Sequence, residues 1–140
     1  MDSKEVAYKA AEFIFNKKGF DVVIIDLRGL TPIADFFVIC SADSDTQVKA
    51  IAEEVDVNLK EMDIRTWHKE GFKNLNWVLL DYVDVVVHVF KKETREYYNL
   101  ERLWGDAPAT KVEDSALSAA SNKIDSGSKV SKKSGSSKKS

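Results

Sequence analysis

Residues 76–90, NWVLLDYVDVVVHVF, constrain the fold of this chain more than any other segment. Two apolar runs, 77–81 and 84–90, are rich in valine and leucine and have the length of single buried β-strands. Only Tyr82 and Val83 separate them, so the chain has to reverse direction there. The segment therefore predicts a hydrophobic β-hairpin inside a sheet.

The second run of this hairpin has two different faces, because alternate residues of a strand point to opposite sides of a sheet. Three valines at alternate positions form one apolar face, which we expect to lie in the core. The opposite face carries Asp84, Val86, His88 and Phe90. This mixture is unusual for a core and also for a plain solvent-exposed face.

The rest of the chain alternates between helical and strand patterns. Apolar residues spaced three or four apart predict helices at 4–18, 43–62 and 91–104. Short apolar runs predict further strands at 21–27, 36–41 and 64–68. The last helix is expected to break near Asn99. The order α-β-β-α-β-β-β-α predicts an α/β fold, with a five-stranded β-sheet flanked by helices on both faces.

Composition divides the chain into one folded domain, 1–112, and a tail, 113–140, rich in serine and lysine. The tail is expected to be disordered, because it has too little apolar surface to offset the entropy of ordering. Residues 123–140 have a net charge of +5 in a chain of net charge −2, so the first 122 residues are net −7. An acidic domain favours a basic protein partner over a nucleic-acid backbone.

The cellular setting is predicted from three simpler features. Cys40 is the only cysteine, which excludes an intramolecular disulfide and fits a reducing compartment. The first 20 residues include acidic side chains and form a helical pattern, which is not typical of a targeting peptide. No apolar run is long enough to span a membrane. We therefore expect a cytoplasmic protein with no membrane association.

Catalytic interpretations of the hairpin residues lack the necessary partners. His68 is the only other histidine besides His88, and neither lies in a metal-binding motif, so a buried structural role is favoured for His88. Asp81 and Asp84 could bind Mg²⁺ or share acid–base chemistry, but their positions favour hydrogen bonds within the turn. The chain has no glycine-rich phosphate loop and no serine-hydrolase motif. The sequence thus predicts no cofactor, no metal and no enzymatic activity.

Large aromatic residues near the hairpin leave two interpretations open. Trp77 and Leu79 share a strand face, and Tyr98 and Trp104 lie on the last predicted helix. Aromatic residues beside acidic ones are typical of protein-binding hot spots, and equally of an ordinary core. The spacing of these residues alone does not distinguish the binding-surface interpretation from the core interpretation.

Three long motifs give the chain a resemblance to a known family. They are ADFFVICSADSDTQVKAIAEEV, WVLLDYVDVVVHVF and YYNLERLWGDA, in this order and at near-constant spacing, and the resemblance runs from about Val6 to Ala107. In these motifs the chain resembles the ribosomal silencing factors, also called the Iojap family. The resemblance implies a mixed α/β sheet, distantly similar to nucleotidyltransferases but without their active site.

The resemblance also implies a function and a partner. Members of this family are non-enzymatic; they bind the large ribosomal subunit through its protein number fourteen, block joining of the small subunit and repress translation when nutrients are limiting. The positions that match the family's most characteristic segments are Trp77, Leu79, Asp81, Tyr82, Asp84, Val86, His88, Phe90, Tyr98, Leu100, Glu101 and Trp104. Among these we expect Trp77, Tyr82, Asp84, His88 and Phe90 to face the partner. Tyr98, Leu100 and Trp104 are alternatively expected to fix the last helix to the sheet.

The chain departs from the family pattern at two places. Val83 stands where the family usually has glycine, and a β-branched residue would be strained there if the turn needs positive φ. The basic tail matches no family motif, and it could add contact with ribosomal RNA or serve only as a solubilising tail. The alternatives to silencing are a nucleotidyltransferase-like enzyme and a self-associating structural domain. The free protein is expected to be a monomer or a weak homodimer.

Overall fold

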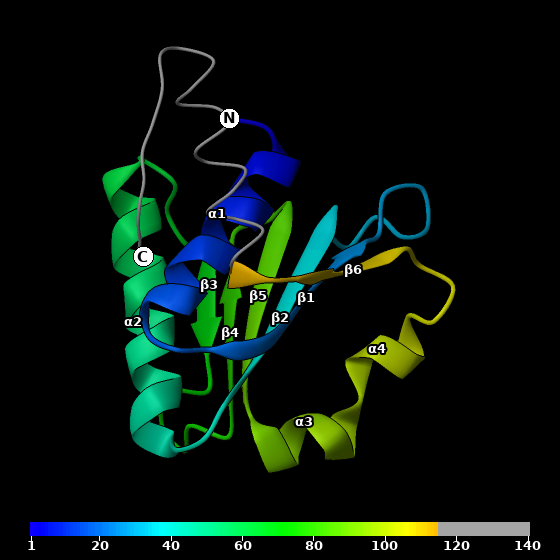
Figure 1. Cartoon of the computed structure of the whole chain (residues 1–140). Coiled ribbons are helices and arrows are strands. Elements are labelled where there is room, and N and C mark those ends of the chain that lie inside the picture. Colours follow the sequence, from blue (N-terminus) through cyan, green and yellow to red (C-terminus); the bar gives the residue numbers. More distant parts are fainter. Residues whose placement is uncertain (115–140) are drawn as a thin grey trace.

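The structure, a computed structural model, describes residues 1–114 (Figure 1). Its elements in chain order are α1 Ser3–Asn16, β1 Phe20–Asp26, β2 Phe36–Ala42, α2 Asp45–Glu61, β3 His68–Glu70, β4 Trp77–Asp81, β5 Val85–Lys91, α3 Lys92–Tyr98, α4 Leu100–Leu103 and β6 Ala109–Val112. All but the first two residues of the predicted tail lie outside the described residues. None of the described helices is both long and apolar enough to cross a membrane.

One mixed sheet organises the described chain, as predicted. Its strand order is β3-β4-β5-β2-β1-β6, and every neighbouring pair is antiparallel except β2 with β5. The β4–β5 hairpin lies where it was predicted, except that β5 is shifted by one residue, to Val85–Lys91. Placing β2 beside β5 brings together, at the centre of the sheet, two strands that are buried throughout except at Lys91.

The number of strands and the position of one strand differ from the prediction. The sheet has six strands rather than five, because Ala109–Val112 adds an edge strand to β1. The strand expected at 64–68 begins only at His68 and runs to Glu70, with all three residues exposed. Both are edge strands held by main-chain hydrogen bonds on one side, so they need no apolar pattern.

The two long helices pack on one face of the sheet. Figure 1 shows α1 and α2 side by side, with α3 and α4 set apart from them. The alternating valines of β5 lie on the helix-covered side, as predicted, within a cluster that includes Ala10, Ile51 and Leu59. Ser44 caps α2, since its hydroxyl accepts a hydrogen bond from the Gln47 N–H at 3.2 Å.

The other face of the sheet carries a smaller apolar cluster. Ile25, Phe37, Ile39 and Phe90 are buried in it. Further apolar side chains, Val23, Trp77, Leu79, Leu100 and Trp104, pack against this cluster and are only partly buried. The segment after β5 therefore covers this face in part, through residues of α4 and its C-terminal end.

The last helix breaks at Asn99, as predicted. Asn99 adopts a left-handed conformation with φ of 47°, which ends α3. Its side chain then accepts a hydrogen bond from the Arg102 N–H at 3.3 Å and so caps α4. Asparagine suits both roles, because it tolerates positive φ and caps helix N-termini well.

The hairpin turn is centred on Val83, which has a positive φ of 75°. The Asp84 N–H donates to the Tyr82 carbonyl at 2.9 Å, which closes a three-residue γ-turn around Val83. Asp81 supports the turn, since its carboxylate accepts the Val83 N–H at 2.8 Å. The local hydrogen-bonding role predicted for Asp81 is confirmed. Because φ of Val83 is positive, this β-branched residue is also strained, as was expected for a turn that needs positive φ.

Replacing Val83 by glycine is expected to leave stability unchanged or to raise the free energy of unfolding by up to about 1 kcal/mol. Glycine adopts positive φ without steric cost, and the Val83 side chain is 57% exposed, so little packing is lost. Val83→Ala is the control, because it keeps a Cβ at positive φ and should gain less. A clear fall in melting temperature for the glycine variant would contradict this expectation.

Candidate docking surface

A hydrogen bond between two strands lies at the centre of the partly covered face. The Trp77 indole N–H of β4 donates to Nδ1 of His88 on β5 at 3.1 Å. The Trp77 ring stacks on Phe90 with centroids 4.8 Å apart and touches Tyr98 at 4.9 Å. Trp77 therefore joins β4, β5 and α3 into a single aromatic cluster.

His88 is a buried, neutral residue of this cluster. Only 3% of it is exposed, and its ring meets Phe37 edge-on with centroids 4.6 Å apart. Burial lowers the pKa of His88 to about 3. Since Nδ1 accepts the indole N–H, the proton of the neutral ring lies on Nε2, which has no hydrogen-bond partner within the described residues. The geometry agrees with the structural role favoured from sequence.

The residues expected to face a partner are divided by the structure into buried and accessible ones. Val86, His88 and Phe90 are buried, so they offer almost no side-chain surface for contact. Partly accessible residues on the same side are Trp77, Leu79, Asp81, Leu100, Glu101 and Trp104. Asp84 and Tyr98 are exposed.

Tyr82 lies on the opposite side of the sheet from Trp77. It is buried in the cluster under the helices, and its hydroxyl donates to the Asp56 carboxylate of α2 at 3.0 Å. Burial first, and then the nearby Asp56, raise the pKa of Tyr82. The expectation that Tyr82 shares a surface with Trp77 is therefore wrong, because alternation along β4 points it toward α2.

Arg95 fixes the segment that follows β5. Its guanidinium donates to the Ser41 hydroxyl at 2.9 Å, to the Glu101 carboxylate at 2.7 Å and to the Asp21 carbonyl. These bonds join α3 to β1, β2 and α4. Glu101 is thus a support for the surface, and Arg95 holds Tyr98 and Trp104 beside the sheet.

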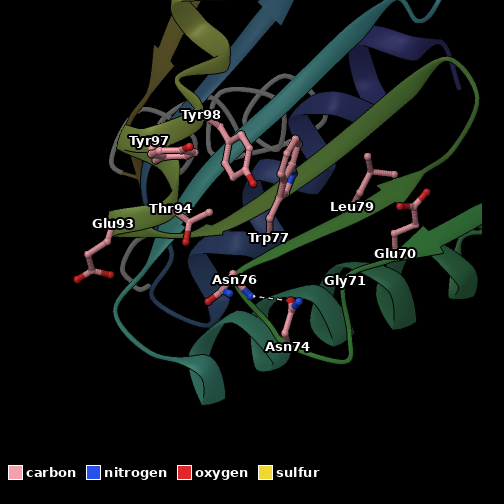
Figure 2. A pocket seen from close by; sticks show the side chains of 10 residues that line it. All are labelled: Glu70, Gly71, Asn74, Asn76, Trp77, Leu79, Glu93, Thr94, Tyr97 and Tyr98. Atoms are coloured by element: carbon pink, nitrogen blue, oxygen red, sulfur yellow. Dashed lines mark hydrogen bonds between the residues drawn. The ribbon is translucent and has the colours of Figure 1, made fainter.

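A hollow of about 540 Å³ opens beside Trp77, between the β3–β4 loop and α3 (Figure 2). Sequence reasoning missed most of its lining, including Glu70, Glu93 and Tyr97. The spacing of residues in the sequence could have indicated the part of the lining that comes from α3. Glu93 and Tyr97 are four residues apart, as are Thr94 and Tyr98, so these pairs share one side of α3.

Comparison with known proteins identifies the family. A family model described as "Ribosomal silencing factor during starvation" matches residues 1–139. The chain belongs to this family. It is 45% identical over 113 residues to the ribosomal silencing factor RsfS of Halalkalibacterium halodurans, covering 81% of this chain and 97% of that protein. It is 46% identical over 108 residues to RsfS of Bacillus subtilis, covering 77% and 92%.

A solved structure agrees with the fold of this silencing-factor chain. The crystal structure of a Chromobacterium violaceum protein superposes with a TM-score of 0.73 at 39% identity, covering 75% of this chain and 88% of the other. The silencing-factor family is not a known class of enzyme. Within residues 1–114, no group of three or more histidine, cysteine, aspartate or glutamate side chains is placed to hold a metal ion.

Proposed function

We propose that this chain is a ribosomal silencing factor that binds the large ribosomal subunit through its protein number fourteen. The bound domain fills space that the small subunit needs, and so represses translation in the cytoplasm when nutrients are limiting. The observation that carries this proposal is the family match over residues 1–139. No chemical step is part of this mechanism, so the chain acts by occupancy and not as an enzyme.

The partly covered sheet face is the surface that we propose for docking. Its accessible residues are Trp77, Leu79, Asp81, Tyr98, Leu100 and Trp104, which we call the docking surface. Aromatic and aliphatic side chains held rigidly over a packed cluster are typical of interface hot spots. Val86, His88 and Phe90 support these residues from below.

The rival enzymatic interpretation has less support in the geometry. One carboxylate oxygen of Asp81 accepts the Val83 N–H of the turn at 2.8 Å. Asp84 contributes to the turn through its main chain, since its N–H donates to the Tyr82 carbonyl at 2.9 Å. Calorimetry with ATP and Mg²⁺ tests the rival directly, and stoichiometric micromolar binding would favour it.

The substitution Leu79→Lys is expected to weaken binding to isolated large-subunit protein number fourteen by about tenfold or more. The charge would enter the centre of the docking surface and repel a basic partner. Val57→Lys is the matched control, because Val57 is 54% exposed on α2, outside this surface. Titration calorimetry measures both affinities, and thermal unfolding confirms that both variants fold. Equal affinity of the two variants would exclude this face.

A further inference from the structure

The hollow beside Trp77 combines aromatic walls with two carboxylates. It is lined by Glu70, Gly71, Asn74, Asn76, Trp77, Leu79, Glu93, Thr94, Tyr97 and Tyr98. Figure 2 shows Glu70 and Glu93 on opposite sides of the hollow, with Trp77 and Tyr98 between them. No lysine or arginine is among the lining residues.

The two glutamates are available to a ligand. Both side chains are exposed, and Glu93 has no ion pair within the described part of the chain. Among residues 1–114, Glu70 makes a hydrogen bond or ion pair only through one oxygen, with the exposed His68 ring at 2.6 Å, and its other oxygen has no such partner. The hollow thus has a negative charge on each side and no internal cation to balance it.

Its walls suit a flat cation. Trp77 and Tyr98 lie with ring centroids 4.9 Å apart, and Tyr97 meets Tyr98 edge-on at 5.1 Å. Aromatic faces attract cations, tryptophan most strongly. A planar guanidinium can lie along such rings while its N–H groups reach a carboxylate in two parallel hydrogen bonds, which an ammonium cannot do. Asn74 and Asn76 also line the hollow, and the Asn74 amide oxygen accepts the Asn76 main-chain N–H at 3.4 Å.

We propose that this hollow binds an arginine side chain of a basic protein partner. The inference deepens the proposed function and rests on it for the identity of that partner, while the recognition chemistry is a property of the hollow itself. The excess of negative charge over residues 1–122 steers a basic surface toward the domain. The hollow then selects one side chain from that surface, and it shares Trp77, Leu79 and Tyr98 with the docking surface.

The first test removes the two charges without changing side-chain shape. The double variant Glu70→Gln/Glu93→Gln is compared with Glu53→Gln/Glu96→Gln, which neutralises two exposed glutamates outside the hollow. Calorimetry with purified large subunits is expected to show about a tenfold loss of affinity for the first variant and about twofold or less for the control. Equal losses for the two variants would overturn the inference, because steering by overall charge would then explain both.

The second test needs no ribosome, so its failure is distinct from failure of the proposed function. The full chain labelled with ¹⁵N is titrated with N-acetyl-arginine amide and with N-acetyl-citrulline amide, which has the same shape but no charge. The Trp77 indole N–H signal, assigned with Trp77→Phe, is expected to shift with the arginine compound only. The Glu70→Gln/Glu93→Gln variant should abolish that shift. No shift in the unmodified chain, or equal shifts with both compounds, would overturn the inference.

Discussion

Replacing Gly71 by alanine is expected to lower the free energy of unfolding by about 3 kcal/mol or more. Gly71 has a positive φ of 93°, which strains any residue with a side chain. A Cβ at this position would also lie 1.9 Å from the Trp77 carbonyl oxygen, where it meets backbone that cannot move aside easily. Relieving the clash would push the 71–76 loop away from β4.

Gly29→Ala is the matched control for this experiment. Gly29 also has a positive φ, 81°, but a Cβ there meets nothing within 4 Å. Gly29→Ala is therefore expected to lower the free energy of unfolding only through backbone strain at positive φ, by about 1 kcal/mol. Urea denaturation of the two variants separates clash from strain. Similar losses for both would show that the β3–β4 loop is free to move away from Trp77.

Acidification from pH 7.5 to pH 5 is expected to reduce stability by about 2 kcal/mol through His88 alone. Burial lowers the pKa of His88 to about 3 in the folded chain, against 6.5 for an ordinary histidine. The unfolded chain therefore binds the proton first as the pH falls. The contribution is fully present above about pH 6.5 and is lost progressively toward pH 3.

Two glutamine variants isolate this effect. His88→Gln retains an acceptor for the Trp77 indole but does not titrate, so its stability should change less between pH 7.5 and 5. His68→Gln is the control variant, because it replaces an exposed histidine by the same residue. Chemical denaturation at several pH values gives the slopes. Parallel curves for the unmodified chain and His88→Gln would contradict the buried, neutral state.

The sequence was sufficient to predict the central elements, because their signals are local. The repeated valines predicted where β5 lies and which of its faces the helices cover. The spacing of apolar residues predicted α2. The edge strands β3 and β6 were misplaced or missed, since a strand paired on one side needs only main-chain hydrogen bonds. Nothing in the composition of residues 109–112 marks them as part of a sheet.

The docking surface could be predicted only in part. Alternation correctly placed Val86, His88 and Phe90 on one face, but it does not say what covers that face. Trp77 and the segment after β5 cover this face. Val86, His88 and Phe90 are therefore buried and support the accessible residues from below. The hollow beside Trp77 was beyond prediction, because Glu70 and Glu93 come from separate elements whose proximity depends on the loop at Gly71 and on the anchoring of α3 by Arg95.

Co-sedimentation with purified ribosomal particles tests the proposed steric block most directly. The chain is mixed with isolated large subunits and, separately, with intact ribosomes, and the pelleted fraction is measured in each. Binding to large subunits with little binding to intact ribosomes is the predicted result, because the small subunit would already occupy the same space. Equal binding to both particles would contradict the proposed function.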